Sequence, residues 1–304
     1  MDVSIIIVNY HTSVLIKNLL DTIYNKTEGV SFEIIVVDNH PTPQFAADLR
    51  IYMNAITYLP LAENVGFGRA NNEGVKVAKG RNIFFLNPDT LIVNNAVKIL
   101  SDYLDAHEKV GVCGGNLYDA SMMPMHSFMR TLSSLLWEVD SIMAGLIFKV
   151  LYGKNTQHNY TQHPIKVGYV TGADMMVKRA ILDKVGLFDP DFFMYYEETE
   201  LSYRIKKAGY KIMSVPAAKI IHLEGQSFSM KEERIRTIIS SQKLYDKKTN
   251  HSRFYSCINT RLRVLNCRFR ILIFSMIKDE NRLLFWRAWL KGYLEQTNRF
   301  SVNA

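Results

Sequence analysis

The chain of 304 residues contains little cysteine, and its three cysteines form no pattern. Cys113, Cys257 and Cys267 are widely spaced, with no CxxC pair and no even framework. Disulfides are therefore not expected, and a reducing compartment is favoured over secretion.

Long apolar runs are also missing. The N-terminal run Ser4–Val8 is interrupted at once by Asn9, which argues against a signal peptide. The sequence has no run of about 18 or more uncharged apolar residues, so a membrane-spanning helix is not expected. We predict a cytoplasmic protein.

Positive charge is concentrated in the last quarter of the chain. Residues 231–304 contain 16 basic and 6 acidic side chains, whereas residues 1–230 contain 21 basic and 23 acidic ones. We predict a globular domain at 1–230 and a separate basic helical region at 231–304 that faces an anionic partner.

The first hundred residues alternate between apolar strands and helices of amphipathic spacing. This order predicts an α/β domain with a parallel sheet and right-handed crossovers. The expected strands are Val3–Val8, Phe32–Val37, Ile56–Leu59, Ile83–Leu86, Val110–Gly114, Met175–Val177 and Lys211–Val215, and the expected helices include Ser13–Tyr24, with Ser13 as N-cap, Phe45–Asn54, Asn95–His107, Arg179–Val185 and Glu197–Lys207.

The organising stretch is the apolar strand Ile83–Leu86, which runs into Asn87, Pro88 and Asp89. Proline ends the strand and leaves Asp89 at its carboxyl end, the edge where open α/β sheets bind ligands. A lone aspartate is more often an ordinary surface residue. Asp89 with His222 could hold Mg²⁺ or Mn²⁺, but one Asp and one His are too few ligands without substrate phosphates. A lone histidine such as His222 is more often structural than a metal ligand.

A second acidic group, Glu197, Glu198 and Glu200, opens a predicted helix. Acidic residues stabilise helix N-termini, which is the simplest explanation for Glu197 and Glu200. Glu198 follows five aromatic or apolar side chains, so partial desolvation would raise its pKa toward that of a general base.

Two other segments leave alternatives open. Residues 63–74 form a glycine- and asparagine-rich turn that fits neither standard phosphate-binding motif, so a helix-entry loop is the simpler interpretation. Residues 132–151 are apolar but contain Glu138 and Asp140. They suit an amphipathic lid, an interfacial helix or an ordinary packed helix.

Taken together, the motifs resemble family 2 glycosyltransferases of the GT-A fold, in particular a bacterial rhamnosyltransferase-like branch. The matching residues, in chain order, are Ser4–Val8 with Asn9 and Tyr10, Val36–Asn39, Asn64–Phe67 with Ala70 and Asn72, Leu86–Asp89, Gly172 and Ala173, Gly186–Asp189, Phe193–Tyr195 with Glu197, Glu198, Glu200 and Leu201, Arg204, and His222 with Gly225 and Ser227.

The resemblance implies a role for each matching residue. Asp89 stands at the last Asp of the family's DxD metal motif, Asn87 replaces the first, and His222 would reach the metal or the diphosphate. Glu198 stands where the family has its catalytic base. The implied donor-binding residues are Asp38, Asn39, Asn64, Gly66, Asn72, Asn87 and Asp89, and those on the acceptor side are Gly172, Ala173, Asp174, Glu197 and Glu200.

The implied reaction is transfer of a sugar, with inversion, from a nucleotide sugar to an acceptor hydroxyl. The branch favours dTDP-rhamnose as donor and a lipid-linked glycan of bacterial O-antigen or capsule synthesis as acceptor. A nucleotidyltransferase is the alternative enzyme, although Asn9-Tyr10-His11 is not the glycine-rich, lysine-containing loop of that class. A catalytically silent sugar-nucleotide binder is the other alternative.

The basic region interleaves arginine with bulky apolar side chains, including Arg261, Arg263, Arg268 and Arg270 beside Leu262, Val264, Leu265 and Phe269. This pattern predicts helices lying in an anionic bilayer surface. The lipid-linked acceptor that the resemblance implies would place them on the cytoplasmic face of the inner membrane. Nucleic-acid binding is an alternative explanation for the positive charge of this region, but it does not require so much apolar surface. A homodimer interface or packing on the catalytic domain is the plainer alternative.

Overall fold

The computed structural model describes residues 1–223, 232–250 and 252–301. Two compact units divide the chain. The first unit contains Met1–Leu132, Lys154–Phe193 and Glu197–Phe228, and the second contains Ser133–Gly153, Met194–Tyr196 and Ser229–Ala304. The second unit therefore includes a segment from the middle of the chain as well as the basic region.

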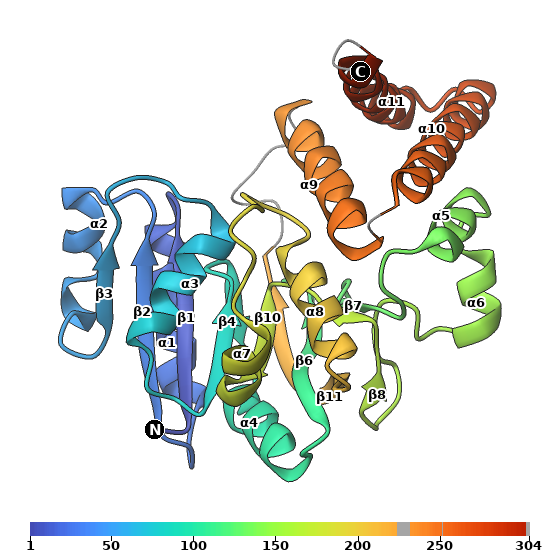
Figure 1. Cartoon of the computed structure of the whole chain (residues 1–304). Coiled ribbons are helices and arrows are strands. Elements are labelled where there is room, and N and C mark those ends of the chain that lie inside the picture. Colours follow the sequence, from blue (N-terminus) through green and yellow to red (C-terminus); the bar gives the residue numbers. More distant parts are fainter. Residues whose placement is uncertain (224–231, 251, 302–304) are drawn as a thin grey trace. The chain divides into compact units, whose positions relative to one another are not determined.

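A mixed sheet forms the centre of the first unit (Figure 1). Its order is β3-β2-β1-β4-β10-β6-β11-β5, with β8 paired to β11, and β7 and β9 form a separate pair. The strands are β1 (Val3–Asn9), β2 (Phe32–Asp38), β3 (Thr57–Pro60), β4 (Asn82–Leu86), β5 (Thr90–Ile92), β6 (Val110–Tyr118), β7 (Phe128–Met129), β8 (Ile165–Lys166), β9 (Tyr169–Val170), β10 (Asp174–Lys178) and β11 (Lys211–His222).

Strands β1 to β4 are parallel, as the sequence predicts. The side chains of β1 and β4, and of β2 from Ile34 on, are buried on both faces, which is why these strands read as continuous apolar runs, whereas β3 at the edge of the sheet is partly exposed. Strand β10 is antiparallel to both β4 and β6, so the sheet is mixed beyond β4.

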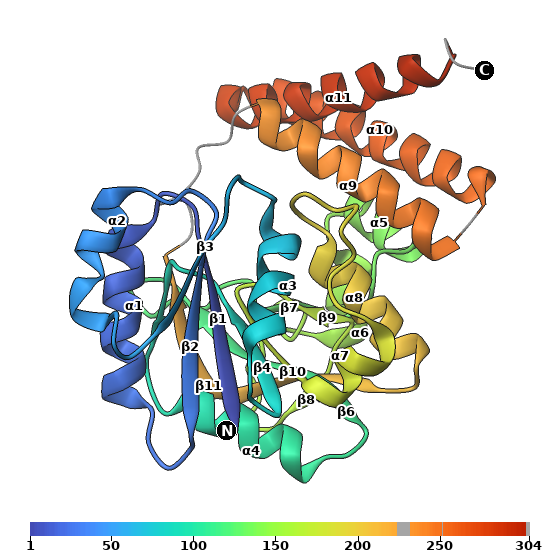
Figure 2. The same cartoon turned by 60° about the vertical axis from the view of Figure 1, so that its left-hand side comes forward.

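Helices cover both faces of this sheet (Figure 2). One core joins the strands to α1 (Ser13–Lys26), α2 (Pro43–Asp48) and α4 (Ala96–Ala106). The other joins them to α3 (Phe67–Val77), α7 (Arg179–Val185) and α8 (Glu197–Lys207). Helices on both faces of a mostly parallel sheet make the expected α/β layers.

Three local expectations are wrong. Thr12, not Ser13, is the N-cap of α1, and the helix predicted at Phe45–Asn54 is α2 followed by a short 3₁₀ turn at Arg50–Tyr52. Strand β11 continues through Pro216 to His222 instead of ending at Val215. Its pairing with β6 is irregular between Ser214 and Lys219, and proline is tolerated in sheets at such irregular positions because it cannot donate to the ladder.

The second unit is helical, as predicted for the basic region. Its helices are α5 (Leu135–Ile142), α6 (Leu146–Tyr152), α9 (Glu232–Asn250), α10 (Arg253–Met276) and α11 (Glu280–Ser301). Ile235 and Ile239 of α9, Cys267 of α10 and Tyr293 of α11 form its small apolar core. Of the described helices, none contains a segment long and apolar enough to cross a bilayer.

A buried ion-pair network joins three helices of the second unit. Nε of Arg263 donates to Oε1 of Glu138 at 2.7 Å, and Nη1 donates to Oδ2 of Asp246 at 2.9 Å. All three side chains are less than 5% exposed. Glu138 therefore fixes α5 against α10. Leu136 and Val139 on α5 stay exposed, so the lid and the interfacial helix stay predictions for residues 132–151. The expectation that Arg263 faces a membrane is wrong.

Replacing Arg263 with methionine should destabilise the second unit by about 3–5 kcal/mol, because two carboxylates would stay buried without their cation. All three tryptophans of the chain, Trp137, Trp286 and Trp289, belong to this unit, so tryptophan fluorescence during urea unfolding reports on it selectively. The matched control is Arg261→Met on the exposed face of the same helix, expected to change stability by less than about 0.5 kcal/mol. Equal midpoints for the two variants would contradict a structural role for Arg263.

Candidate active site

The carboxyl ends of three parallel strands bring the predicted site residues to one edge of the sheet. Asn9 ends β1 and Asp38 ends β2, paired in register, while β4 leads directly into Asn87. The strand order reverses between β1 and β4, because β1 is followed outward by β2 and β3 whereas β4 lies on its other side. Open α/β sheets bind ligands at such switch points, so the fold itself selects this edge.

Asp89 and His222 lie together, as the sequence predicts. Nε2 of His222 is 3.3 Å from Oδ1 of Asp89, and the two residues are 9% and 6% exposed. Pairing of β11 with β5 sets this geometry, because His222 is opposite Thr90. The backbone N–H of Leu223 also donates to the carbonyl oxygen of Asp89 at 2.8 Å.

Asn87 adds an oxygen that has no protein partner. Its Oδ1 is buried and accepts no hydrogen bond from the described residues, whereas its backbone N–H donates to the carbonyl oxygen of Ala173 at 3.0 Å. Buried polar atoms usually have a partner, so the Oδ1 atom of Asn87 is available to a bound ligand. The part of the chain that the structure describes contains no cluster of three or more His, Cys, Asp or Glu side chains that could hold a metal. A cation here would therefore need the amide oxygen of Asn87 and oxygens from a ligand.

Glu198 reaches the same region from the start of α8. A Cβ atom built on Gly172 would lie 3.9 Å from both Cβ and Cγ of Glu198. Ala173, the next residue, is the one that accepts the hydrogen bond from Asn87. The backbone of Asn87 and the side chain of Glu198 therefore lie beside adjacent residues of one short segment.

The environment of Glu198 suits a base. Its side chain is partly buried, and burial raises its pKa above the ordinary glutamate value, while the hydroxyl of Thr199, 2.9 Å from Oε1, opposes that shift. Burial raises the pKa of Glu197 still further, and the charge of Glu198 adds to this. Tyr195 and Tyr196, immediately before the helix, both have positive φ angles, 69° and 70°. Such backbone strain is concentrated at functional sites.

Asp38 and Asn39 are buried in a polar network. The carboxylate of Asp38 accepts hydrogen bonds from Nδ2 of Asn9, from the backbone N–H of His40 and from the Tyr58 hydroxyl, at 2.7, 3.0 and 2.7 Å. The side chain of Asn39 bonds to the backbone of Val65 and Gly66. These bonds fix the strand ends and the following turn. Contact of Asp38 or Asn39 with a nucleotide stays a prediction.

Asn64 and Gly66 form a tight turn before α3. Oδ1 of Asn64 accepts a hydrogen bond from the N–H of Gly66 at 3.0 Å. Gly66 has φ 90° and ψ 173°, and a Cβ atom there would lie 2.3 Å from the carbonyl oxygen of Phe193. Only glycine fits this conformation and this close backbone approach.

Gly66→Ala should therefore lower the stability of the first unit by about 1–3 kcal/mol for the backbone conformation, and by more for the clash. Gly209→Ala is the matched control, because Gly209 also has positive φ, 91°, but no atom lies within 4 Å of its added Cβ. Urea unfolding followed by circular dichroism compares the two. An equal loss in both variants would mean that the approach of Phe193 does not constrain Gly66.

Two of the predicted contact residues, Asn72 and Glu200, make structural hydrogen bonds. Asn72 uses its amide twice, donating from Nδ2 to the carbonyl oxygen of Phe188 at 2.8 Å and accepting from the Phe188 N–H at 3.0 Å. Glu200 binds the guanidinium of Arg204, whose Nη atoms donate to the carbonyl oxygens of Val185, Gly186 and Leu187. These bonds hold α3 and α8 to the segment 185–188 at the end of α7. A donor contact for Asn72 and an acceptor contact for Glu200 stay predictions.

Asp174 does not reach the surface. It is fully buried in β10, and its Oδ2 accepts a hydrogen bond from the Gly115 N–H at 2.6 Å. Burial raises its pKa well above the ordinary aspartate value. Its Oδ1 accepts no hydrogen bond from the described residues, and contact of Asp174 with an acceptor stays a prediction. Gly225 and Ser227, which are part of the resemblance, lie outside the described residues.

Sequence reasoning missed an aromatic cluster at the same edge. The ring centroids of His11 and His40 are 4.0 Å apart, and that of Tyr10 is 4.6 Å from that of His11. The positions directly after the apolar runs of β1 and β2 were the available signal, because residues that follow parallel strands meet at one edge.

Comparisons with known proteins agree with this geometry. Residues 4–186 match the family described as glycosyl transferase family 2. A dTDP-rhamnosyl transferase of Shigella flexneri is 24% identical over 72% of this chain and 68% of its own length. An N-acetylglucosaminyl-diphospho-decaprenol L-rhamnosyltransferase of Mycobacterium tuberculosis is 26% identical over 64% of this chain and 67% of its own.

Solved structures support the same fold. The mannosyltransferase of Pyrobaculum calidifontis, solved with GDP-Man and Mn²⁺, superposes with a TM-score of 0.59 at 15% identity, over 96% of this chain and 84% of that one. This likeness confirms the GT-A fold. The family match over more than half of the chain shows that the protein belongs to glycosyl transferase family 2 and is a glycosyltransferase.

Proposed function

We propose that the chain is an inverting, cation-dependent glycosyltransferase that transfers rhamnose from dTDP-rhamnose to a hydroxyl of a lipid-linked glycan in bacterial surface polysaccharide synthesis. The main observation behind the proposal is that the Asn87 backbone and the Glu198 side chain lie beside the adjacent residues Ala173 and Gly172. Asp89 and His222 lie together just beyond the carboxyl end of β4. The two rhamnosyltransferase relatives support the sugar and the lipid diphosphate.

Asp89, His222 and Asn87 would hold the divalent cation, Mg²⁺ or Mn²⁺. Carboxylate, imidazole and amide oxygen suit either ion, and the donor diphosphate would complete the coordination. When bound, the cation neutralises charge that develops on the departing diphosphate. The Mn²⁺ in the Pyrobaculum calidifontis structure supports this assignment.

We assign the other residues to the binding of either the nucleotide-sugar donor or the acceptor. The Asp38 and Asn39 network and the turn at Asn64 and Gly66 lie at the carboxyl ends of β1 and β2, where the nucleotide would bind. Gly172, Ala173 and Glu197 would lie on the acceptor side with Glu198. Glu198 would take the proton of the acceptor hydroxyl as its oxygen attacks the anomeric carbon. A single displacement of this kind inverts that centre.

A panel of nucleotide sugars, each with Mn²⁺, Mg²⁺ or EDTA and a lipid-linked acceptor, tests the proposal through release of nucleoside diphosphate. Release that needs dTDP-rhamnose and a cation is the expected result. Release of pyrophosphate from a nucleoside triphosphate and a sugar phosphate would favour a nucleotidyltransferase. Donor binding in calorimetry without any release would favour a silent binder. We propose that residues 231–304 contact the cytoplasmic face of the inner membrane, where a lipid-linked acceptor would lie.

A further inference from the structure

The outward face of α10 carries an exposed apolar stripe. Leu265, Phe269, Leu272 and Met276 are between 44% and 75% exposed, and Phe254 is 75% exposed. Their spacing places them on one side of the helix, opposite the buried Arg263. A continuous exposed apolar surface of this kind indicates an interaction site.

The arginines of α10 separate into two groups. Arg263 binds two buried carboxylates, and Nη2 of Arg270 donates to the carbonyl oxygen of Ser141. Arg261 and Arg268 instead lie on the exposed face, among the apolar side chains. The helix contains five arginines and no aspartate or glutamate. Its outward face is therefore both apolar and cationic.

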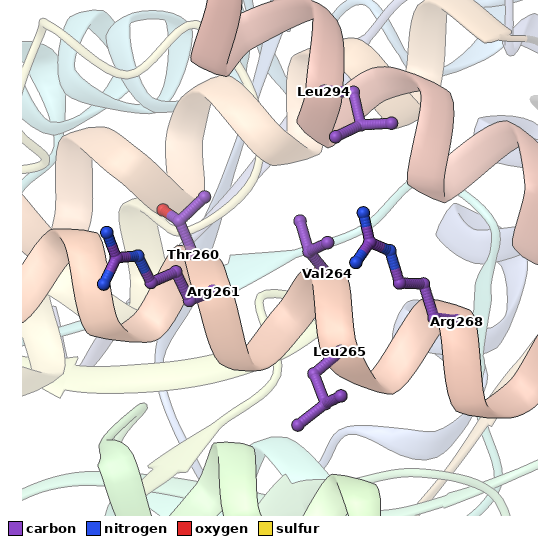
Figure 3. Close-up of a pocket in the computed structure, with 6 residues that line it drawn as sticks. All are labelled: Thr260, Arg261, Val264, Leu265, Arg268 and Leu294. Carbon is purple, nitrogen blue, oxygen red and sulfur yellow. The ribbon is translucent and has the colours of Figure 1, made fainter.

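The two exposed arginines also border a groove between α10 and α11 (Figure 3). Val264 and Leu265 of α10 and Leu294 of α11 supply its apolar lining, and Thr260 lies at one end. The groove encloses about 370 Å³, within the range of roughly 300–1,000 Å³ found for small-molecule sites. A phosphate bound by the guanidinium groups would leave an attached hydrocarbon chain against aliphatic side chains.

We propose that this face of α10, with the groove beside it, docks on an anionic phospholipid bilayer. Leu265, Phe269, Leu272 and Met276 would enter the acyl boundary, and Arg261 and Arg268 would bind lipid phosphates. A second copy of the chain is a poorer occupant, because α10 offers no acidic side chain to receive the arginines of a partner helix. The inference rests on the proposed function only in placing the acceptor at a membrane.

Sedimentation of the full chain with vesicles tests the proposal without any donor. Binding to vesicles of equal parts phosphatidylglycerol and phosphatidylcholine should be strong, should weaken with salt, and should be much weaker with phosphatidylcholine alone. Arg261→Gln with Arg268→Gln should reduce the partition coefficient about 10- to 30-fold, from about 1 kcal/mol for each basic side chain. Leu265→Gln with Phe269→Gln should reduce it at least as much.

Lys17→Gln with Arg50→Gln removes the same charge from exposed positions of the first unit and should change binding less than two-fold. Equal loss in this control, or equal binding to neutral vesicles, would overturn the proposal. A second contradicting result would be a dimer in light scattering that becomes a monomer in the variant Leu265→Gln with Phe269→Gln. In that case a second copy of the chain, and not a bilayer, would cover this face. Nucleoside diphosphate release with a water-soluble acceptor should be the same in all these variants, which separates failure of docking from failure of the proposed enzyme.

Discussion

Replacing Asp89 with asparagine is expected to reduce kcat/KM for sugar transfer by about 10³-fold or more, the upper range seen when one charge-stabilising group is removed from an active site. The change keeps the shape of the side chain and the backbone hydrogen bond from Leu223, so the fold should persist. What it removes is the negative charge beside His222. Mn²⁺ binding in the presence of nucleoside diphosphate should weaken in parallel, which electron paramagnetic resonance of free Mn²⁺ measures directly.

The control for this variant is Asp102→Asn. Asp102 is exposed on α4 and pairs with Lys98, so the same chemical change there should leave transfer within two-fold of the wild type. Loss of activity in the Asp89 variant with unchanged Mn²⁺ binding would mean that Asp89 acts in some way other than holding a cation. Full activity in that variant would remove Asp89 from the site.

Replacing Glu198 with glutamine is expected to lower kcat about 10²- to 10⁴-fold, the usual contribution of a general base. Donor affinity should stay within about three-fold, because the proposed proton transfer involves the acceptor and not the donor. Glu73→Gln on the exposed face of α3 is the matched control. A variant that loses donor binding as strongly as turnover would assign Glu198 to the donor site.

The pH dependence gives Glu198 a second test. Burial raises its pKa, and a base must be deprotonated to act. The wild-type kcat should therefore fall as pH decreases through that raised pKa, so its acid limb should lie above the ordinary pKa of glutamate. The small residual rate of Glu198→Gln should lack this limb. An identical limb in both proteins would assign the titration to another group.

The sequence predicts the first half of the sheet well, because β1, β2 and β4 are apolar on both faces and end at polar residues. It could not predict the second half. The Met175–Val177 run has the same composition whether it pairs parallel or antiparallel, and only tertiary contacts place β10 antiparallel between β4 and β6. Continuation of β11 through Pro216 likewise depends on the irregular pairing with β6.

For the candidate site, the sequence identifies which residues are special but not what each one contacts. Asp89 and His222 are predicted as a pair and lie 3.3 Å apart. Asp174 and Glu200 also belong to the acidic motifs, yet the structure buries the first in a strand and pairs the second with Arg204. A carboxylate that supports the fold and one that faces a substrate look alike in a sequence, because the difference lies in neighbours that are distant along the chain.

The helical unit shows the same limit. A change in charge near residue 230 marks the basic region, but the membership of Ser133–Gly153 in that unit depends on Glu138 meeting Arg263, 125 residues away. The sequence also does not show which arginines of α10 are buried and which are exposed. The structure separates Arg263, which is buried, from Arg261 and Arg268, which are exposed.

The arrangement of the active site can be tested by a crystal structure of the protein with a nucleotide sugar and Mn²⁺. We expect the diphosphate beside Asp89, Asn87 and His222, and the anomeric carbon on the side of Glu198. A nucleotide bound at any other edge of the sheet, or a sugar whose anomeric carbon faces away from Glu198, would contradict it.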